Sequence, residues 1–355
     1  FEKKEVRKYD RSAQFAIAAA TESVEDAGFD MEAVDKDRVG VIFAAGIGGI
    51  ATFEQEVGGF YASEERIPRF NPFFIPKMIG DIAAGHISMM YGFRGPNNIC
   101  SSACASSNSA IASAIDQIRL GRVNVMITGG AEAPICAAGI GGFNNMHALS
   151  TRNDSPQTAS RPFSKSRDGF VMGEGAGVLV LEEYDHAKAR GAKIYAEVVG
   201  YGQTADAHDM VAPDPEGKGA LKSMELALAD ANLKPADIDY VNPHGTSTGL
   251  GDIAESQAIA QLFGDKEQNP NLAVSSTKSM HGHMLGATGA VEAIVCVKTI
   301  TDDKVAPTIN LDNQDEHVAN LDYVPHKARE KKVNAALSNS FGFGGHNATL
   351  VFKAI

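Results

Sequence analysis

The sequence predicts an α/β fold in which sheets are sandwiched between layers of helices. Short β-branched and apolar stretches alternate with Ala-rich helical stretches along the 355 residues. An apolar fraction of 44% suits a large, well-buried core. A faint internal repeat also indicates that the fold consists of two similar α/β halves.

The elements are predicted from the lengths and periods of these stretches. The predicted strands span residues 39–44, 123–128, 177–182, 195–201, 238–242, 272–275, 333–337 and 348–353. The predicted helices span residues 10–27, 75–90, 105–119, 217–231, 252–262 and 286–299.

The repeat consists of three pieces that occur in the same order in each half. They are a helix with an acidic loop, a Ser-rich turn that opens a small-residue helix, and a Gly-rich turn before a strand. These pieces lie at residues 25–29, 100–118 and 173–182 in the first half, and at 229–233, 275–299 and 342–352 in the second. We therefore expect one half over residues 1–190 and the other over residues 193–355.

Composition and charge exclude several classes of protein. A net charge of −12 argues against nucleic acid as a partner, because phosphate binding needs a concentrated basic face. The sequence has neither a run of eighteen apolar residues nor a signal-peptide layout, so we expect no membrane insertion and a cytoplasmic location. The four cysteines are too few and too scattered for a disulfide framework, and no CxxC pair suggests zinc.

A small basic cluster lies at the start of this acidic chain. Lys3, Lys4, Arg7 and Lys8 fall within the first eight residues. The cluster is either a docking patch for an acidic partner or a solvated helix start.

The first candidate for chemistry is Cys104, in a segment where a strand turns abruptly into an Ala- and Ser-rich helix over residues 98–107. The turn puts Cys104 near a helix N-terminus, where free N–H groups and the helix dipole favour the nucleophilic thiolate. The alternative is a small, inert, buried cysteine, and this segment alone does not exclude it.

The second candidate is His244, which follows a strand and precedes a helix expected to have its N-cap at Asp252. Strand ends in α/β folds are where ligands gather, and an imidazole there donates to a developing oxyanion or moves a proton. The alternative is a histidine hydrogen-bonded within its loop. Thr246 and Thr248 offer hydroxyls on one side of the same segment.

The third segment combines Lys278 with His281 and His283 before a helix that carries Glu292. The two histidines alone do not make a metal site, because no third ligand has suitable spacing, and we predict no metal. Lys278 and Glu292 are expected to form a polar network that fixes His283, with a plain surface ion pair as the alternative.

The fourth segment, residues 339–347, is a glycine-rich turn between two strands. Its glycines permit positive φ and a close approach of the backbone to a ligand, so its N–H groups can complete an oxyanion hole. It is not a dinucleotide-binding motif, because it lacks GxGxxG spacing and opens into a strand.

Together the four segments resemble the β-ketoacyl-acyl-carrier-protein synthases of the thiolase superfamily, specifically the elongating Cys-His-His class. The resemblance covers essentially the whole chain and includes residues 161–163, 167–170 and 173–177. It implies a five-layer α-β-α-β-α fold of two related halves, a homodimer, and an opening strand that is missing from this sequence. It also implies an acyltransferase with no bound cofactor, whose substrates are carried on the phosphopantetheine of acyl carrier protein.

The resemblance also implies a role for each matching residue. Cys104 resembles the nucleophile that takes up the acyl group, and His244 and His283 resemble the pair that promotes malonyl decarboxylation and steadies the enolate. The other implied roles are the oxyanion hole (N–H of Cys104 and Phe341), pantetheine contacts (Thr246, Thr248), a supporting pair (Lys278, Glu292), the acyl gate (Ile47, Phe143, Phe341) and carrier docking (Lys4, Arg7, Lys8).

Three histidines depart from the pattern of this family. His281 and His346 stand where close relatives usually carry Thr, and His147 stands where some carry Arg. We expect His281 and His346 to tune their neighbours rather than to replace His283.

Related classes fit the sequence less well. A degradative thiolase needs a second cysteine in the glycine turn, and initiating synthases resemble a Cys-His-Asn set instead. A polyketide ketosynthase shares all the motifs and stays open as an alternative. A chain-length-factor subunit is the non-catalytic alternative, but such subunits lack the nucleophile.

Overall fold

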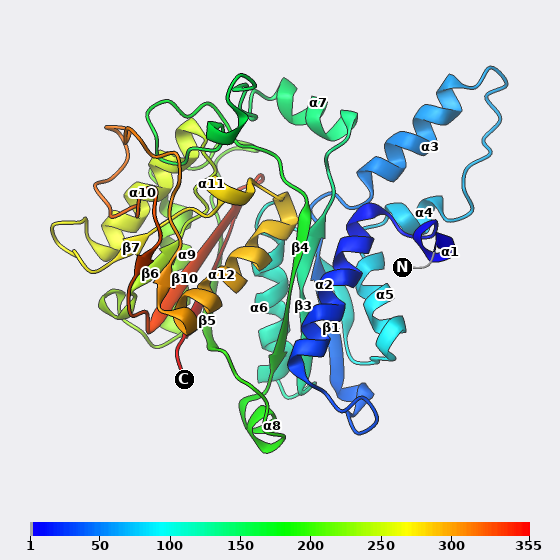
Figure 1. The fold of residues 1–355 in the computed structure, drawn as a ribbon, viewed down its shortest axis with the longest axis horizontal. Helices are drawn as coiled ribbons and strands as arrows, with labels where there is room; N and C mark the ends of the chain where they lie inside the picture. Colours follow the sequence, from blue (N-terminus) through cyan, green and yellow to red (C-terminus); the bar gives the residue numbers. More distant parts are fainter. Residues whose placement is uncertain (1–2) are drawn as a thin grey trace.

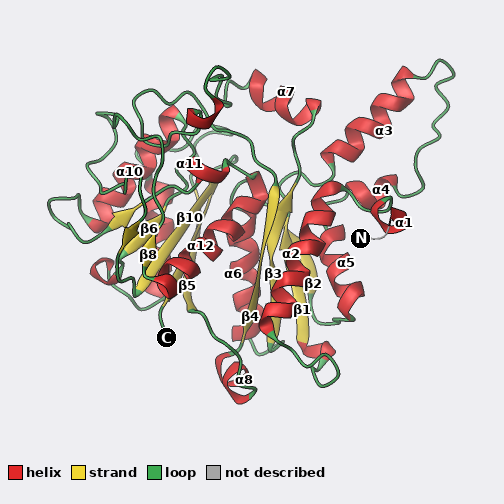
Figure 2. Cartoon of the chain, in the orientation of Figure 1, coloured by secondary structure: helices red, strands yellow, loops and turns green. Residues whose placement is uncertain are grey.

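The computed structural model describes residues 3–355 and contains two main sheets (Figures 1 and 2). In the first sheet the order is β2-β1-β3-β4, formed by Asn97–Cys100, Val39–Ala44, Val125–Glu132 and Gly175–Glu182. Strand β1 runs parallel to β2 and β3, whereas β4 is antiparallel to β3.

The second sheet has the order β5-β11-β10-β6-β7. Its strands are Glu197–Ala205, His346–Lys353, Ala335–Gly342, Tyr240–Asn242 and Ala273–Val274. Strands β10 and β11 form an antiparallel hairpin, and β6 runs parallel to β10 and β7. A separate antiparallel pair consists of β8 (Lys304–Val305) and β9 (Arg329–Glu330).

Two helices fill the space between the sheets, α6 (Ser106–Arg119) and α12 (Thr288–Asp302), as Figure 1 shows. Both are rich in small residues, which lets the helices approach the sheets and one another closely. Their contacts form a single buried cluster in which Ile111 and Ile115 of α6 meet Ala293 and Cys296 of α12, together with Leu350 of the second sheet. Leu179 and Leu181 of β4 in the first sheet pack against the same cluster, so the two main sheets share their innermost core.

Helices on the outer faces complete the layers. The first sheet is covered by α2 (Arg11–Ala27) and α5 (Ile82–Tyr91), and the second by α9 (Lys218–Asp230) and α10 (Gly249–Phe263). Asp10 caps the N-terminus of α2 by accepting from Ser12 N, and Gly28 ends that helix at φ +63°. The layer order is α-β-α-β-α, which confirms the predicted fold class.

The remaining helices are short or peripheral. They are α1 (Lys3–Val6), α3 (Ile50–Ala62), α4 (Phe74–Met78), α7 (Ala137–Asn145), α8 (Tyr184–Ala189) and α11 (Lys278–His281). In Figure 1, α3 extends away from the body of the protein. Large apolar side chains are exposed on α3, on α4 and on the segment between them, namely Phe53, Tyr61, Ile67, Phe70, Phe73 and Ile75.

The predicted strands lie where expected, apart from shifts at their ends, but some helix predictions were wrong. The helix predicted over residues 75–90 is two helices, α4 and α5, with a break around Gly80. Helices α3, α7 and α8 were not predicted. Asp252 is not an N-cap, because α10 begins earlier, at Gly249; its buried carboxylate instead accepts from Phe163 N and Ser247 N.

Across residues 3–355, no helix has both the length and the apolar character needed to span a bilayer. The division into halves at residues 190 and 193 stays a prediction.

Candidate active site

Cys104 lies on a sharp turn between β2 and α6. Ala103, the residue before it, has φ +50°, a conformation that costs energy for a residue with a side chain. Ser106 stabilises the turn, because its hydroxyl donates to Ala103 O at 2.6 Å and accepts from Ser102 N at 2.8 Å. Gly342 approaches from β10 so closely that a Cβ there would lie 2.9 Å from Cys104 N.

His283 is the direct partner of the thiol. Its Nε2 lies 3.1 Å from Cys104 Sγ, and its Nδ1 lies 3.0 Å from Thr288 Oγ1 at the start of α12. The ring is buried, and Phe170 packs edge-on against it with ring centroids 5.3 Å apart. Hydrogen bonds at both nitrogens therefore fix the orientation of the imidazole.

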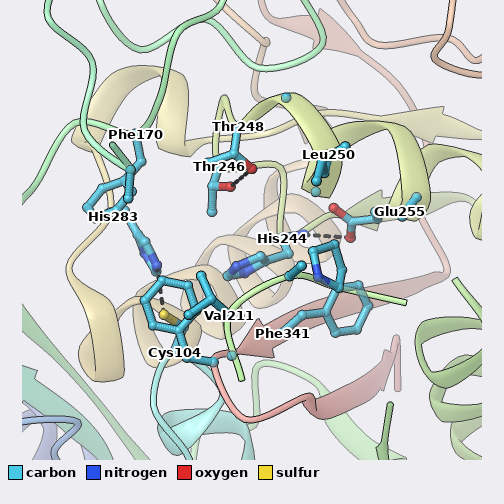
Figure 3. A pocket seen from close by; sticks show the side chains of 18 of the residues that line it. Cys104, Phe170, Val211, His244, Thr246, Thr248, Leu250, Glu255, His283 and Phe341 are labelled. Atoms are coloured by element: carbon cyan, nitrogen blue, oxygen red, sulfur yellow. Dashed lines mark hydrogen bonds between the residues drawn. The ribbon is translucent and has the colours of Figure 1, made fainter. Parts of the chain in front are cut away.

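His244 is the second imidazole beside the sulfur (Figure 3). Its ring centroid is 5.3 Å from that of His283, and the two rings are nearly perpendicular. Glu255 of α10 holds the turn that carries His244 by accepting from His244 N and Gly245 N, each at 2.7 Å. The Nδ1 atom of His244 is buried and has no hydrogen-bond partner among the described residues.

The surroundings favour the neutral forms of these three groups. Burial, reinforced by the Lys278 charge, lowers the pKa of His244 and of His283 well below its usual value. Burial also raises the pKa of the Cys104 thiol to about 12, although Lys278 and nearby N–H groups oppose the shift. The expectation that the helix N-terminus favours a resting thiolate was therefore wrong, because desolvation outweighs the dipole. Ionisation of Cys104 requires transfer of its proton to a base.

Lys278 and Glu292 form a buried ion pair. Lys278 Nζ lies 2.6 and 2.8 Å from the two carboxylate oxygens of Glu292, and both side chains are at most 1% exposed. Burial raises the pKa of Glu292 to about 7, against the lowering effect of Lys278. This geometry excludes a plain surface pair. The hydrogen-bond partners of the His283 ring, however, are Thr288 and Cys104, so the pair makes no hydrogen bond to that ring, and the Lys278 charge lowers its pKa.

The second backbone donor near the sulfur belongs to Phe343 and not to Phe341. The backbone N–H groups of Cys104 and Phe343 both act on the Cys104 thiol and lower its pKa, against the effect of burial. Phe341 is still within β10, in register with Asn347 of β11, whereas Phe343 lies in the turn where the ladder has ended. The prediction of Phe341 N–H as the donor is corrected accordingly. The Phe341 ring packs beside His244, at a centroid distance of 5.8 Å.

These groups lie in a cavity of about 390 Å³, a size typical of ligand pockets. Thr246 and Thr248 line it, with their hydroxyl oxygens 3.0 Å apart. Phe143 of α7 also lines it and contacts Phe170 edge-on at 5.4 Å. The other lining residues include Met146, His147, Phe170, Val211, Leu250, Leu285 and Phe343.

Other predicted residues lie outside the lining of this cavity. Ile47 is 41% exposed on the loop after β1. Lys4, Arg7 and Lys8 are on or just after α1, and Lys8 is paired with Glu5 at 2.7 Å.

The three departing histidines have different surroundings. His281 bonds Gly282 O and Thr277 Oγ1 through its two ring nitrogens, so these nitrogens are not arranged with His283 as metal ligands. His346 lies beside Gly344 at the start of β11 and is exposed, and His147 is exposed in the lining of the cavity.

Sequence reasoning missed Glu255, Thr288, Phe170 and Phe343. A signal existed for Glu255, because it shares the buried face of α10 with Ala258 and Ile259, where an acid needs a specific partner. The others depend on contacts between distant segments.

Sequence comparisons assign the chain to a family. Residues 1–187 match the Beta-ketoacyl synthase, N-terminal domain, and residues 195–312 match the Beta-ketoacyl synthase, C-terminal domain. The chain is 49% identical over 352 residues to 3-oxoacyl-acyl-carrier-protein synthase 2 of Staphylococcus aureus strain COL, covering 99% of this chain and 84% of the relative. It is 48% identical over 354 residues to the Vibrio harveyi protein of the same name, with the same coverage.

Solved structures agree with this assignment. A β-ketoacyl synthase from Burkholderia phymatum STM815 is 38% identical with a TM-score of 0.91, covering 99% of this chain and 84% of that one. A chain from a complex of a type II polyketide acyl-carrier protein with its ketosynthase is 35% identical with a TM-score of 0.93, covering 97% and 85%. The described site and these matches lead to one conclusion: the chain belongs to the β-ketoacyl synthase family.

Proposed function

We propose that this protein is a 3-oxoacyl-acyl-carrier-protein synthase of the elongating type, an acyltransferase that condenses an acyl group held on Cys104 with malonyl carrier. The observation that carries the proposal is the convergence of Cys104, His283 and His244 at one cavity. The curated relatives bear the name of this activity at 48–49% identity.

In the first half-reaction, Cys104 attacks the thioester carbonyl of an acyl carrier. We assign the proton of the neutral His283 ring to Nδ1, where it donates to Thr288, so that Nε2 accepts the thiol proton. The sulfur forms a bond to the carbonyl carbon, and the bond to the pantetheine sulfur breaks. The departing thiolate recovers a proton, leaving an acyl-Cys104 thioester. The N–H groups of Cys104 and Phe343 are suited to stabilise the oxyanion.

In the second half-reaction, malonyl carrier loses its carboxylate as CO₂, and the electron pair of the broken bond forms an enolate at the thioester. A neutral imidazole donates a hydrogen bond without carrying charge, which suits His244 to steady the enolate oxygen. His283 shares this role once Cys104 is acylated if its ring proton then lies on Nε2 and Nδ1 accepts from the Thr288 hydroxyl. The enolate carbon then attacks the acyl-Cys104 carbonyl. Cys104 leaves, takes up a proton, and the 3-oxoacyl product stays on the carrier.

The cavity is suited to a substrate delivered on an arm. Thr246 and Thr248 present hydroxyls along the cavity wall, where they can bond the amides of phosphopantetheine. Phe143 and Phe170 contact each other and form an aromatic part of the same wall. We propose acyl carrier protein as the partner, with substrates bound through its arm and no resident cofactor. The proposed docking residues for this acidic partner are Lys4, Arg7 and Lys8. Lys8 can bind the partner only after its ion pair with Glu5 breaks.

We also propose a homodimer. Strand β2 is at the edge of its sheet, where a second copy can continue the ladder, and large apolar side chains are exposed on α3 and α4. Light scattering after size exclusion should give twice the chain mass of 37.4 kDa. A mass of one chain at micromolar concentration would contradict the dimer.

The enzymatic proposal is tested by incubating the protein with acyl carriers of graded chain length and following Cys104 acylation by intact mass. Malonyl carrier is then added, and the 3-oxoacyl product is identified by mass. We expect acylation that disappears in Cys104→Ala, followed by a single condensation. Absence of Cys104-dependent acylation with every chain length would refute the enzyme.

A polyketide ketosynthase is the second candidate, favoured by the likeness to the chain from the polyketide complex. The two differ in the number of condensations before release. Repeated extension on malonyl carrier alone would support the polyketide assignment, whereas one condensation per acyl chain supports fatty acid elongation.

A further inference from the structure

Glu132, the last residue of β3, is a fully buried carboxylate whose hydrogen-bond partners within residues 3–355 are all backbone N–H groups. It accepts from Gly46 at 2.9 Å, from Ile47 at 3.1 Å and from Gly48 at 3.1 Å. It also accepts from Gly286 at 3.1 Å. Its partners therefore come from two segments that are far apart in sequence.

Strand pairing explains how one side chain reaches both segments. Strands β1 and β3 are parallel, with Ala44 in register with Gly130, so Glu132 lies beside the loop that follows β1. The second segment is the turn over residues 285–287, which comes directly after His283. The carboxylate thus bridges the end of the first sheet and the segment that carries the catalytic imidazole.

The two glycines at this bridge leave no room for side chains. A Cβ on Gly46 would lie 2.6 Å from Glu132 Oε2, and a Cβ on Gly286 would clash with Gly46 N. The same position on Gly46 is 3.5 Å from Ala103 O, in the strained turn before Cys104. Glu132 is therefore packed where the Cys104 turn, the His283 turn and the loop after β1 meet.

The peptide of Gly286 is held on both sides. Glu132 accepts its N–H, while the hydroxyl of Ser107 in α6 donates to its carbonyl. Because Ser107 lies three residues after Cys104, this contact links the nucleophile's helix directly to the His283 turn. Burying a carboxylate without a charged partner costs free energy. Four backbone N–H groups offset this cost at Glu132, which indicates that the carboxylate holds these backbone segments in place.

We propose that Glu132 is a positioning residue for the condensation, which fixes the His283 turn relative to Cys104 by binding Gly286 together with the loop over residues 46–48. The inference rests on the proposed function, because Cys104 and His283 must meet for the chemistry to proceed. Loss of this bridge leaves substrate binding at Thr246 and Thr248 intact but loosens the 3.1 Å contact between sulfur and imidazole.

The test is Glu132→Gln, with Asp10→Asn as the matched control. Asp10 is also a buried acid, 3% exposed, that accepts from a backbone N–H and a hydroxyl, at Ser12 and Thr52. For Glu132→Gln we expect kcat for malonyl-carrier decarboxylation to fall about tenfold or more, with KM changed less than about twofold. Asp10→Asn should keep kcat within about twofold of wild type, even if its melting temperature falls as much as that of Glu132→Gln.

A second readout needs no carrier and no catalysis. The rate of Cys104 alkylation by iodoacetamide at pH 8, followed by peptide mass, should fall about threefold in Gly46→Ala, because this variant keeps the charge of Glu132 but loosens the contact between the thiol and its base, His283. This measurement separates the outcomes: a wild-type protein that never acylates Cys104 refutes the proposed function, while slower alkylation in Gly46→Ala still supports the bridge.

Unchanged kcat in folded Glu132→Gln would overturn the proposal, as would an equal loss of kcat in Asp10→Asn. If Glu132→Gln does not fold, Gly46→Ala decides. Its Cβ displaces the carboxylate without removing it, so we expect the same selective fall in kcat. Wild-type kcat in Gly46→Ala would then overturn the proposal.

Discussion

Thr288→Val should slow the enzyme by breaking the contact that orients His283. The substitution keeps the shape of the side chain but removes the hydroxyl 3.0 Å from His283 Nδ1. Thr288 is 1% exposed, so water cannot replace the lost partner. The N–H of the imidazole is then left unsatisfied, or the ring turns and Nε2 leaves Cys104.

The magnitude follows from the cost of an unsatisfied buried donor. That cost is about 1–3 kcal/mol, and when it falls on the transition state the rate drops roughly 5- to 150-fold. We expect the loss in kcat of Cys104 acylation and of malonyl decarboxylation, with KM for either carrier little changed. Steady-state and single-turnover assays on purified, folded variants measure it.

Two further variants separate orientation from folding. Thr288→Ser keeps the hydroxyl and should retain kcat within about threefold of wild type. Thr128→Val removes another buried threonine hydroxyl, one that has no hydrogen-bond partner within residues 3–355, so it should leave kcat and stability near wild type. Wild-type kcat in Thr288→Val, or an equal loss in Thr128→Val, would refute the reasoning.

The remaining predictions concern proton transfer, the buried ion pair and acid stability. His283→Ala should abolish condensation while His281→Ala keeps most of it, and the reverse result in a product assay would contradict the assignment of the second imidazole. Lys278→Met leaves the buried Glu292 unpaired and should lower the free energy of unfolding by about 3–5 kcal/mol in urea titrations, a loss that a surface pair would not give. Hydrogen bonds from His317 N and the Arg167 guanidinium lower the pKa of Asp315 below its usual 3.8, so its stabilisation is present above that value and lost as the pH falls. Asp315→Asn should accordingly lower the melting temperature at pH 7, with the difference shrinking below about pH 3.8; a constant difference would contradict the linkage.

Much of the fold was predictable because its strands are short apolar runs between clear breakers. The predicted strand over residues 39–44 coincides with β1, and the helix predicted over residues 105–119 differs from α6 by one residue. Helix α7 escaped prediction because its glycines, at 139, 141 and 142, argue against a helix on local propensity. Its position depends on neighbours that the sequence does not reveal.

The candidate site was predictable in its identities and less so in its electrostatics. Cys104, His244 and His283 do meet, since strand ends and helix starts gather at one edge of an α/β fold. The protonation of Cys104 was not predictable, because burial depends on the whole surrounding core. Likewise, the shift from Phe341 to Phe343 depends on where β10 stops pairing with β11, which local propensity fixes only within a few residues.

The pair of helices between the sheets has a consequence for how the enzyme can vary. Cys104 lies shortly before α6 and His283 shortly before α12. Because these two helices pack in one buried cluster, their packing sets the distance between the sulfur and the imidazole. The walls of the pocket, by contrast, come largely from surface segments such as α7 and the loop around Val211. Substrate range can therefore be re-engineered at the walls while the spacing between the sulfur and the imidazole stays constant.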